Sequence, residues 1–181
     1  MKVVTLTRLN RALADVIRDF EYLGIWNEQL YCVEVFLVPF GYAYGWKWSG
    51  AEGHIDMPAV SISRLGAVMG LYSGVGLRDI LRHEYGHVVA DLYPKLSRSK
   101  AFRQAFGASY GREERIAPYD PEKHVTKYAS TEPAEDFSEV WMFHIKYGGR
   151  LPARFDTPAI RRKWKYVDRV VRTIRAGRRT F

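Results

Sequence analysis

Two histidines and a glutamate stand together in the run His83-Glu84-Tyr85-Gly86-His87. Residues four apart on a helix lie on the same face, so the imidazoles of His83 and His87 can reach a single ion. A carboxylate directly after the first histidine is then placed to act on a metal-bound water. This His-Glu-x-x-His pattern makes a zinc hydrolase the first hypothesis.

The residues around this pattern predict the helix that it requires. Apolar side chains recur at helical spacing from Leu81 to Leu92, and Pro94 ends the run. Gly86 lies inside this helix, where a glycine costs about 1 kcal/mol relative to alanine. It indicates a tight approach by another backbone or by substrate, and ordinary packing explains it equally well.

A second helix downstream carries a candidate third ligand. Pro133 fits the first turn of this helix, after an N-cap at Ser130 or Thr131. Glu135 and Glu139 are one turn apart and share a face. A carboxylate face directed into the core needs a cation or a metal. The ordinary alternative is a solvated acidic face, which the helix dipole favours near an N-terminus.

The spacing of these groups resembles a known family. A tyrosine stands seven residues before the first of these glutamates and a second glutamate four after it, downstream of the His-Glu-x-x-His pattern. This arrangement resembles the gluzincin metallopeptidases, and more narrowly the catalytic domain of anthrax lethal factor and related bacterial metallopeptidases. The resemblance runs from about Gly76 to Trp141. The chain departs from the family at Asp136 and Ser138, where an aromatic residue and an alanine are frequent.

The resemblance implies a site that binds one zinc ion per chain. A zinc ion with three protein ligands keeps its fourth position open for water, which is the arrangement of catalytic sites. Zinc lowers the pKa of that water towards about 7, and Glu84 would pass its proton to the leaving amine. The implied residues are the ligands His83, His87 and Glu135, the phenol of Tyr128 as an oxyanion donor, and Glu139 in support of the ligands.

Other histidines and carboxylates remain alternatives for the third ligand. His124 and Glu132 precede the glutamate helix, but His124 lies in a charged, turn-rich stretch that favours the surface. Asp136 points about 100° around the helix from Glu135, so the two carboxylates are not interchangeable.

Two further histidines have weaker claims to a function. His54, beside Asp56 at the start of a predicted strand, is a candidate for substrate contact or for a second metal, although such a histidine is more often ordinary. His144 lies on the apolar side of the glutamate helix and is expected to be a core residue.

Composition limits the classes of protein that this chain can belong to. Its 181 residues predict one domain, and 47% apolar and 27% charged residues are typical of globular proteins. Cys32 is the only cysteine, so an internal disulfide is excluded. The N-terminus becomes charged too early for a signal peptide, and no apolar run is long enough for a membrane span. A cytoplasmic location is the default expectation, and leaderless export stays open.

The net charge of +8 is concentrated in residues 161–181, which hold nine Lys or Arg and one Asp. Thr157 and Pro158 predict the start of an amphipathic helix over about 157–176, with apolar positions from Trp164 to Ile174. A core-docking helix with a solvated cationic side is the favoured interpretation. The alternative is a tether to an anionic partner such as nucleic acid, an anionic membrane or an acidic substrate.

The rest of the chain predicts an α+β, zincin-like domain in which a small mixed sheet packs beside the His-Glu-x-x-His helix and the glutamate helix. An amphipathic helix is predicted over residues 7–23. Residues 30–38, 42–48 and 55–62 are the predicted strands. Pro58 favours an edge position for the strand 55–62, where an extended peptide substrate would bind. Residues 107–127 form a lid or a loop.

These observations predict a zinc-dependent metalloendopeptidase whose general base is Glu84. Two rivals come from other classes of protein. A catalytically inactive zincin fold could serve as a binding module, although it would have no reason to keep Glu84. A basic nucleic-acid-binding protein with an incidental His-Glu-x-x-His pattern would bind no metal.

Overall fold

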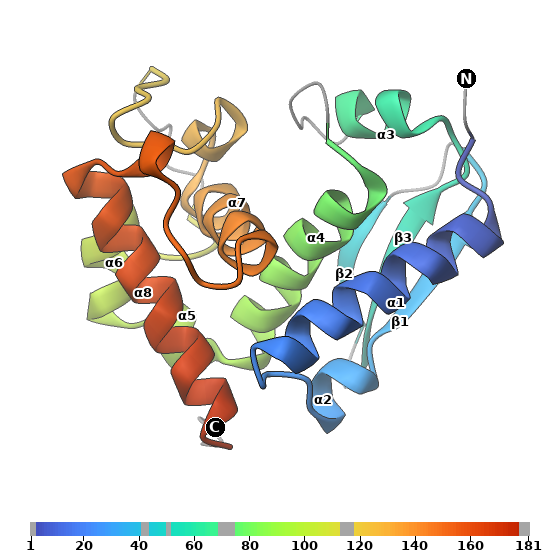
Figure 1. The fold of residues 1–181 in the computed structure, drawn as a ribbon, viewed down its shortest axis with the longest axis horizontal. Helices are drawn as coiled ribbons and strands as arrows, with labels where there is room; N and C mark the ends of the chain where they lie inside the picture. Colours follow the sequence, from blue (N-terminus) through green and yellow to red (C-terminus); the bar gives the residue numbers. More distant parts are fainter. Residues whose placement is uncertain (1–2, 41–43, 50–51, 69–74, 113–117, 178–181) are drawn as a thin grey trace.

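The chain forms an α+β fold, shown as a computed structural model that describes residues 3–40, 44–49, 52–68, 75–112 and 118–177 (Figure 1). A small sheet is formed in the first third of the chain, and helices dominate the remainder. The elements in chain order are α1 (Leu6–Tyr22), α2 (Glu28–Tyr31), β1 (Glu34–Val38), β2 (Gly45–Ser49), β3 (Glu52–Pro58), α3 (Ile62–Val68), α4 (Leu77–Leu92), α5 (Pro94–Ser97), α6 (Lys100–Phe106), the 3-10 helix η1 (Tyr128–Ser130), α7 (Pro133–Lys146), the 3-10 helix η2 (Ala153–Phe155) and α8 (Pro158–Arg175).

The three strands form a mixed sheet in the order β1-β3-β2. β1 pairs in parallel with β3, and β2 pairs antiparallel with it, so that Val35 and Trp46 flank Ile55. The expected small mixed sheet is confirmed, but the prediction that residues 55–62 form an edge strand is wrong. Pro58 is the last residue of the central strand β3, where its missing N–H donor costs the ladder nothing.

The boundaries of the first strand also differ from the prediction. The run Leu30–Val38 does not form one buried strand, because α2 occupies its beginning and β1 starts only at Glu34. Asn27 explains the difference: its side chain accepts a hydrogen bond from the Leu30 N–H at 3.1 Å and so caps a helical turn. The first two residues of the predicted strand 42–48 lie outside the described residues.

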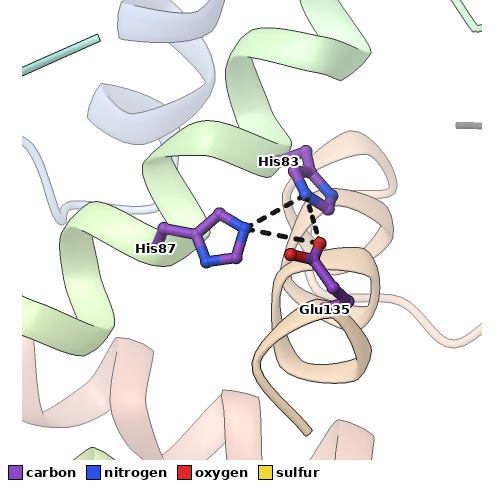
Figure 2. Close-up of side chains that lie close together, drawn as sticks. All are labelled: His83, His87 and Glu135. Carbon is purple, nitrogen blue, oxygen red and sulfur yellow. Dashed lines mark hydrogen bonds and ion pairs between the residues drawn. The ribbon is translucent and has the colours of Figure 1, made fainter. Parts of the chain in front are cut away.

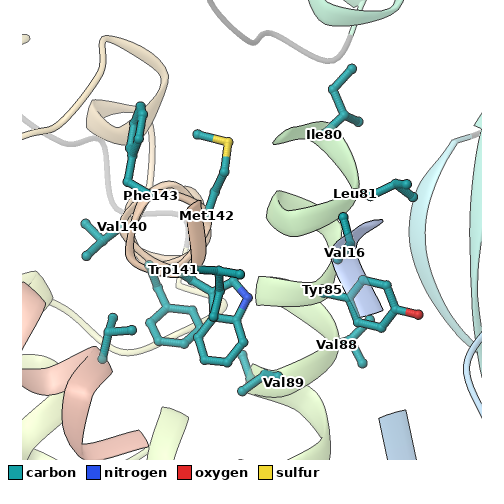
Figure 3. Packing of buried hydrophobic residues seen from close by; sticks show 14 of the residues in the cluster. Val16, Ile80, Leu81, Tyr85, Val88, Val89, Val140, Trp141, Met142 and Phe143 are labelled. Carbon is teal, nitrogen blue, oxygen red and sulfur yellow. The ribbon is translucent and has the colours of Figure 1, made fainter. Parts of the chain in front are cut away.

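Helix α4 occupies the middle of the molecule, with α1, α2 and β2 on one side and α7 on the other (Figure 1). Its apolar residues are buried on both sides (Figure 3). Tyr85 packs edge-on against Phe20 of α1, with 5.1 Å between ring centroids. Trp141 of α7 is fully buried on the opposite side. A helix held from both sides is a rigid support for the side chains that it carries.

The crossing of α4 and α7 is unusually close. A Cβ built at Gly86 would lie 2.8 Å from the Cα of Ser138, so a glycine is required at this position. The tight approach that this glycine indicates in the sequence is therefore an approach by the backbone of α7. The crossing brings the first turns of α7 against the face of α4 that carries His83.

The N-caps predicted for α7 and α8 can be compared with the observed starts of these helices. Helix α8 begins at Pro158, and Thr157 accepts a hydrogen bond from the Ile160 N–H at 3.2 Å, as predicted. Helix α7 begins at Pro133, but its N-cap is Glu132. The hydroxyls of Ser130 and Thr131 donate instead to carbonyls of the preceding turn. Among the described helices, none has the length and apolar character that a membrane span requires.

Candidate metal centre

Three side chains from two helices converge at the crossing of α4 and α7 (Figure 2). His83 and His87 project from one face of α4, and Glu135 projects from the first turn of α7. The Glu135 Oε2 atom lies 3.0 Å from His83 Nε2 and 3.5 Å from His87 Nε2. The two Nε2 atoms are 3.2 Å apart. This group could hold a metal ion, and within the described residues it is the only such group found.

The spacing of these atoms fits a tetrahedral ion. Ligand atoms about 2.0–2.1 Å from a tetrahedral zinc lie about 3.3–3.4 Å from one another. The three observed separations, 3.0, 3.2 and 3.5 Å, lie on both sides of that value. Glu135 Oε2 is buried and faces the two imidazoles. A buried carboxylate oxygen needs a positive partner, which a metal ion or a protonated imidazole supplies.

His83 is held by a chain of buried groups behind it. Its Nδ1 lies 2.9 Å from the Glu139 Oε1 atom, and Glu139 is fully buried. The Thr126 hydroxyl donates to Glu139 Oε2 at 2.6 Å and accepts from the Ala129 N–H at 3.0 Å. With the Nδ1 proton donated to Glu139, the lone pair of His83 Nε2 points into the cluster.

His87 has its own partner in Tyr110. The Tyr110 hydroxyl lies 2.9 Å from His87 Nδ1, and its ring also packs edge-on against Phe102. Burial, the largest influence, and nearby carboxylates raise the pKa of Tyr110 well above 10, so its hydroxyl stays neutral. Sequence reasoning missed Tyr110, because no periodic pattern connects it to a histidine 23 residues earlier.

Glu84 faces the same side of α4 and is fixed by strand β2. Its Oε2 atom accepts a hydrogen bond from the Trp46 N–H at 2.8 Å. The Trp46 side chain is itself anchored on α4, because its indole N–H donates to Asp91 at 2.7 Å. A Cβ at Gly45 would approach Glu84 Oε2 to 3.2 Å, so β2 comes close to this carboxylate. No pattern in the sequence marked Gly45 or Trp46 as site residues.

Tyr128 belongs to η1 and lies across from the two histidines of α4. Its ring centroid is 5.7 Å from that of His83. Burial and the carboxylate of Glu135 raise the pKa of Tyr128 well above 10. The phenol is therefore a neutral hydrogen-bond donor at the edge of the cluster.

A cleft of about 260 Å³ opens over these groups. Its walls bring together side chains from α4, η1 and α7 with the stretch Tyr44–Trp46 of the sheet. The lining contains His83, Glu84, His87, Tyr128 and Glu135, which are the five residues predicted to bind metal or to take part in catalysis. Glu139, predicted to support the ligands, contacts His83 from behind.

Electrostatics favour a positive charge at the centre of the cluster. Burial lowers the pKa of His83, but the carboxylates of Glu135 and Glu139 outweigh burial and raise it from 6.5 to about 10. Burial raises the pKa of Glu135, but the imidazoles of His83 and His87 outweigh burial and hold it well below its usual range. A proton on His83 or a metal cation supplies the positive charge that these carboxylates attract.

The alternative third ligands lie elsewhere. His124 is buried and not at the surface as predicted, because its Nδ1 lies 3.4 Å from Asp136 and 3.4 Å from the Lys163 ammonium. Asp136 points to α8 and not to the metal centre, as its 100° offset predicted. Glu132 is the N-cap residue of α7.

The two histidines with weaker claims are also outside the cluster. His144 is buried, as expected for a core residue, and its Nε2 lies 2.7 Å from the Asp168 carboxylate. His54 lies on the sheet, 3.7 Å from the Asp56 carboxylate and in edge contact with Phe36. Neither side chain reaches the cleft over the α4–α7 crossing.

Comparison with known proteins adds no family to this description. No family model, curated protein or solved structure matches the chain. The interpretation of the site therefore depends on the geometry and chemistry of its own residues.

Proposed function

We propose that the chain is a zinc-dependent metallopeptidase with a zincin-like fold, in which His83, His87 and Glu135 hold one zinc ion. The observation that carries the proposal is the convergence of three lone-pair atoms on one point, while both imidazole Nδ1 atoms already have partners. Two imidazoles and one carboxylate are the ligands of known catalytic zinc sites. Bound zinc would lower the pKa of a water molecule and polarise the substrate carbonyl.

Glu84 is the proposed general base. Its carboxylate lines the cleft beside both histidines, and the Trp46 N–H fixes one of its oxygens at 2.8 Å. Held there, Glu84 accepts a proton from the attacking water and delivers it to the leaving amine. The neutral phenol of Tyr128 donates a hydrogen bond to the oxygen of the scissile carbonyl as negative charge develops on it.

The edge of the sheet next to the cleft is the proposed binding site for an extended peptide. This edge is β2, and not the strand 55–62 that the sequence suggested. The Trp46 N–H points away from β3, since it donates to Glu84. Because Glu84 occupies the Trp46 N–H, a peptide beside β2 would pair with other backbone groups of this edge and lie over the cleft, with its scissile bond near Glu84.

Metal content is the first test of this proposal. We expect about one zinc per chain by elemental analysis. His83→Ala and Glu135→Ala should each lose the metal, because a three-ligand site cannot retain it with two. His54→Ala and Glu122→Ala serve as matched controls, since neither residue lines the cleft. Protein refolded with excess zinc that still holds none would refute the proposal.

A second test separates catalysis from metal binding. Glu84→Gln should retain zinc and lose peptide hydrolysis, measured on a library of fluorogenic peptides. General acid–base groups contribute about 10²–10⁴-fold, so the loss should reach at least the lower value. If the wild-type protein binds zinc but cleaves no peptide, and Glu84→Gln binds the same peptides equally well, the inactive binding module is the better description.

A further inference from the structure

The outer face of α8 carries four cations in one line: Arg162, Lys165, Arg169 and Arg172, called the basic stripe below. At 100° and 1.5 Å per residue, the four lie within about 80° of the helix circumference and along about 15 Å of its length. All four are exposed. Within the described residues, no carboxylate forms a salt bridge with any of them.

Two other cations of α8 have carboxylate partners. Arg161 forms two hydrogen bonds with Asp156, at 2.9 and 2.6 Å. Lys163 is buried on the inner side of α8 and pairs with Asp136. The basic stripe therefore presents four cations without a salt bridge among the described residues, while the neighbouring Asp168 pairs with His144. It lies within a segment (161–181) that carries the whole net charge of the chain. Such a line of charge attracts a polyanion.

The apolar residues of α8 help to decide whether the polyanion is a membrane surface or a nucleic acid. Helices that bind membranes insert apolar or aromatic side chains at the border of their basic face. Here the apolar residues of α8 are used in the protein core: Trp164 is 3% exposed, Val171 is 7% exposed, and Val167 is fully buried. Among the described residues of α8, no large apolar side chain is exposed for insertion, so the helix contributes charge to such a contact.

We propose that the basic stripe binds the phosphate backbone of a nucleic acid without reading its bases. Phosphates follow one another along a strand at intervals that a cation on every helical turn can match. The stripe contains no Asn or Gln, the side chains that pair with adenine edges. This activity is separate from the proposed hydrolysis, because none of the four residues lines the metal centre.

Salt dependence of binding tests this proposal quantitatively. Each phosphate neutralised on a duplex contributes about −0.9 to the slope of log K against log salt, so four contacts predict a slope of about −3.6. Binding of a labelled duplex of about 20 base pairs is followed by fluorescence anisotropy from about 50 to 200 mM NaCl. DNA and RNA duplexes are compared, and their relative affinities identify the preferred backbone.

Two triple variants locate the binding site. In Lys165→Gln/Arg169→Gln/Arg172→Gln the slope should fall to about −0.9, because three of the four contacts are removed. Glutamine has a helix propensity close to that of lysine and arginine, and an unchanged circular dichroism spectrum and Tm confirm folding. The control, Arg11→Gln/Arg18→Gln/Arg78→Gln, removes the same charge from exposed positions on α1 and α4 and should keep the wild-type slope.

Three results would overturn the proposal. The first is no duplex binding by the wild-type protein at about 50 mM salt. The second is an equal loss of slope in both triple variants, which would mean that net charge acts without a defined site. The third is tighter binding to phosphatidylserine–phosphatidylcholine vesicles than to either duplex, lost in the stripe variant, which would identify a membrane surface instead.

Discussion

The substitution Gly86→Ala tests whether the α4–α7 crossing sets the geometry of the metal centre. The new Cβ would lie 2.8 Å from the Cα of Ser138, 3.0 Å from its Oγ and 3.1 Å from its Cβ. Carbon atoms prefer separations of about 3.5–4.0 Å, so the helices must separate by about 0.7 Å. Because a backbone atom blocks the way, rotation of the Ser138 side chain cannot relieve the contact.

Two opposing terms determine the stability of this variant. Overpacking of a core costs about 1–3 kcal/mol, whereas alanine in place of a helical glycine gains about 1 kcal/mol. We expect a net loss of about 1 kcal/mol, which lowers the Tm of a chain of this size by about 2–4 °C. Gly66→Ala in α3 is the matched control: its Cβ meets no described atom within 4 Å, so only the gain remains.

The effect on zinc should exceed the effect on stability. Glu135 moves with α7 and the histidines move with α4, while a metal site tolerates ligand shifts of only about 0.2 Å. We expect zinc affinity, measured by competition with a chromophoric chelator, to fall at least tenfold in Gly86→Ala and to stay unchanged in Gly66→Ala. If both variants are equally stable and bind zinc as tightly as wild type, the crossing does not control the site.

Three further substitutions test the groups that surround the ligands. Glu139→Gln removes the carboxylate behind His83 and should weaken zinc binding about 10–100-fold in the chelator competition, whereas an unchanged affinity would contradict its role. Tyr110→Phe removes the hydroxyl that contacts His87 and should weaken binding about tenfold, with equal affinity as the contrary result. Lys163→Met leaves the fully buried Asp136 without its ammonium partner and should lower the free energy of unfolding in urea by about 3–5 kcal/mol. Lys163→Met/Asp136→Leu should recover most of that loss, and a double variant no more stable than the single one would contradict the pairing.

Local signals in the sequence predicted the elements that hold the metal ligands. Helix α4 follows from its apolar spacing and from Pro94, and the start of α7 follows from Pro133, because periodicity and helix-end signals act within one or two turns. The meeting of His83 and Glu135 was expected only through the family resemblance. In the structure it depends on the crossing at Gly86.

The contacts that were missed depend on pairing between distant segments. The central position of β3 is decided by its parallel partner β1, which no pattern within residues 55–62 encodes. Tyr110 reaches His87 because its ring packs against Phe102 of α6 in the core. The contact of Trp46 with Glu84 follows from the sheet order, which places β2 beside α4.

Adjacent carboxylates on α7 show how one helical turn connects the site to the rest of the fold. Glu135 faces α4 and the two imidazoles, while Asp136, turned by about 100°, faces Lys163 of α8. Lys163 also donates to the carbonyl oxygen of Lys123, in the segment that leads to Thr126. The same buried ammonium thus orders both the turn that bears Glu135 and the loop that supports Glu139. The ion pair of Asp136 with Lys163 therefore holds the first turn of α7 against α8.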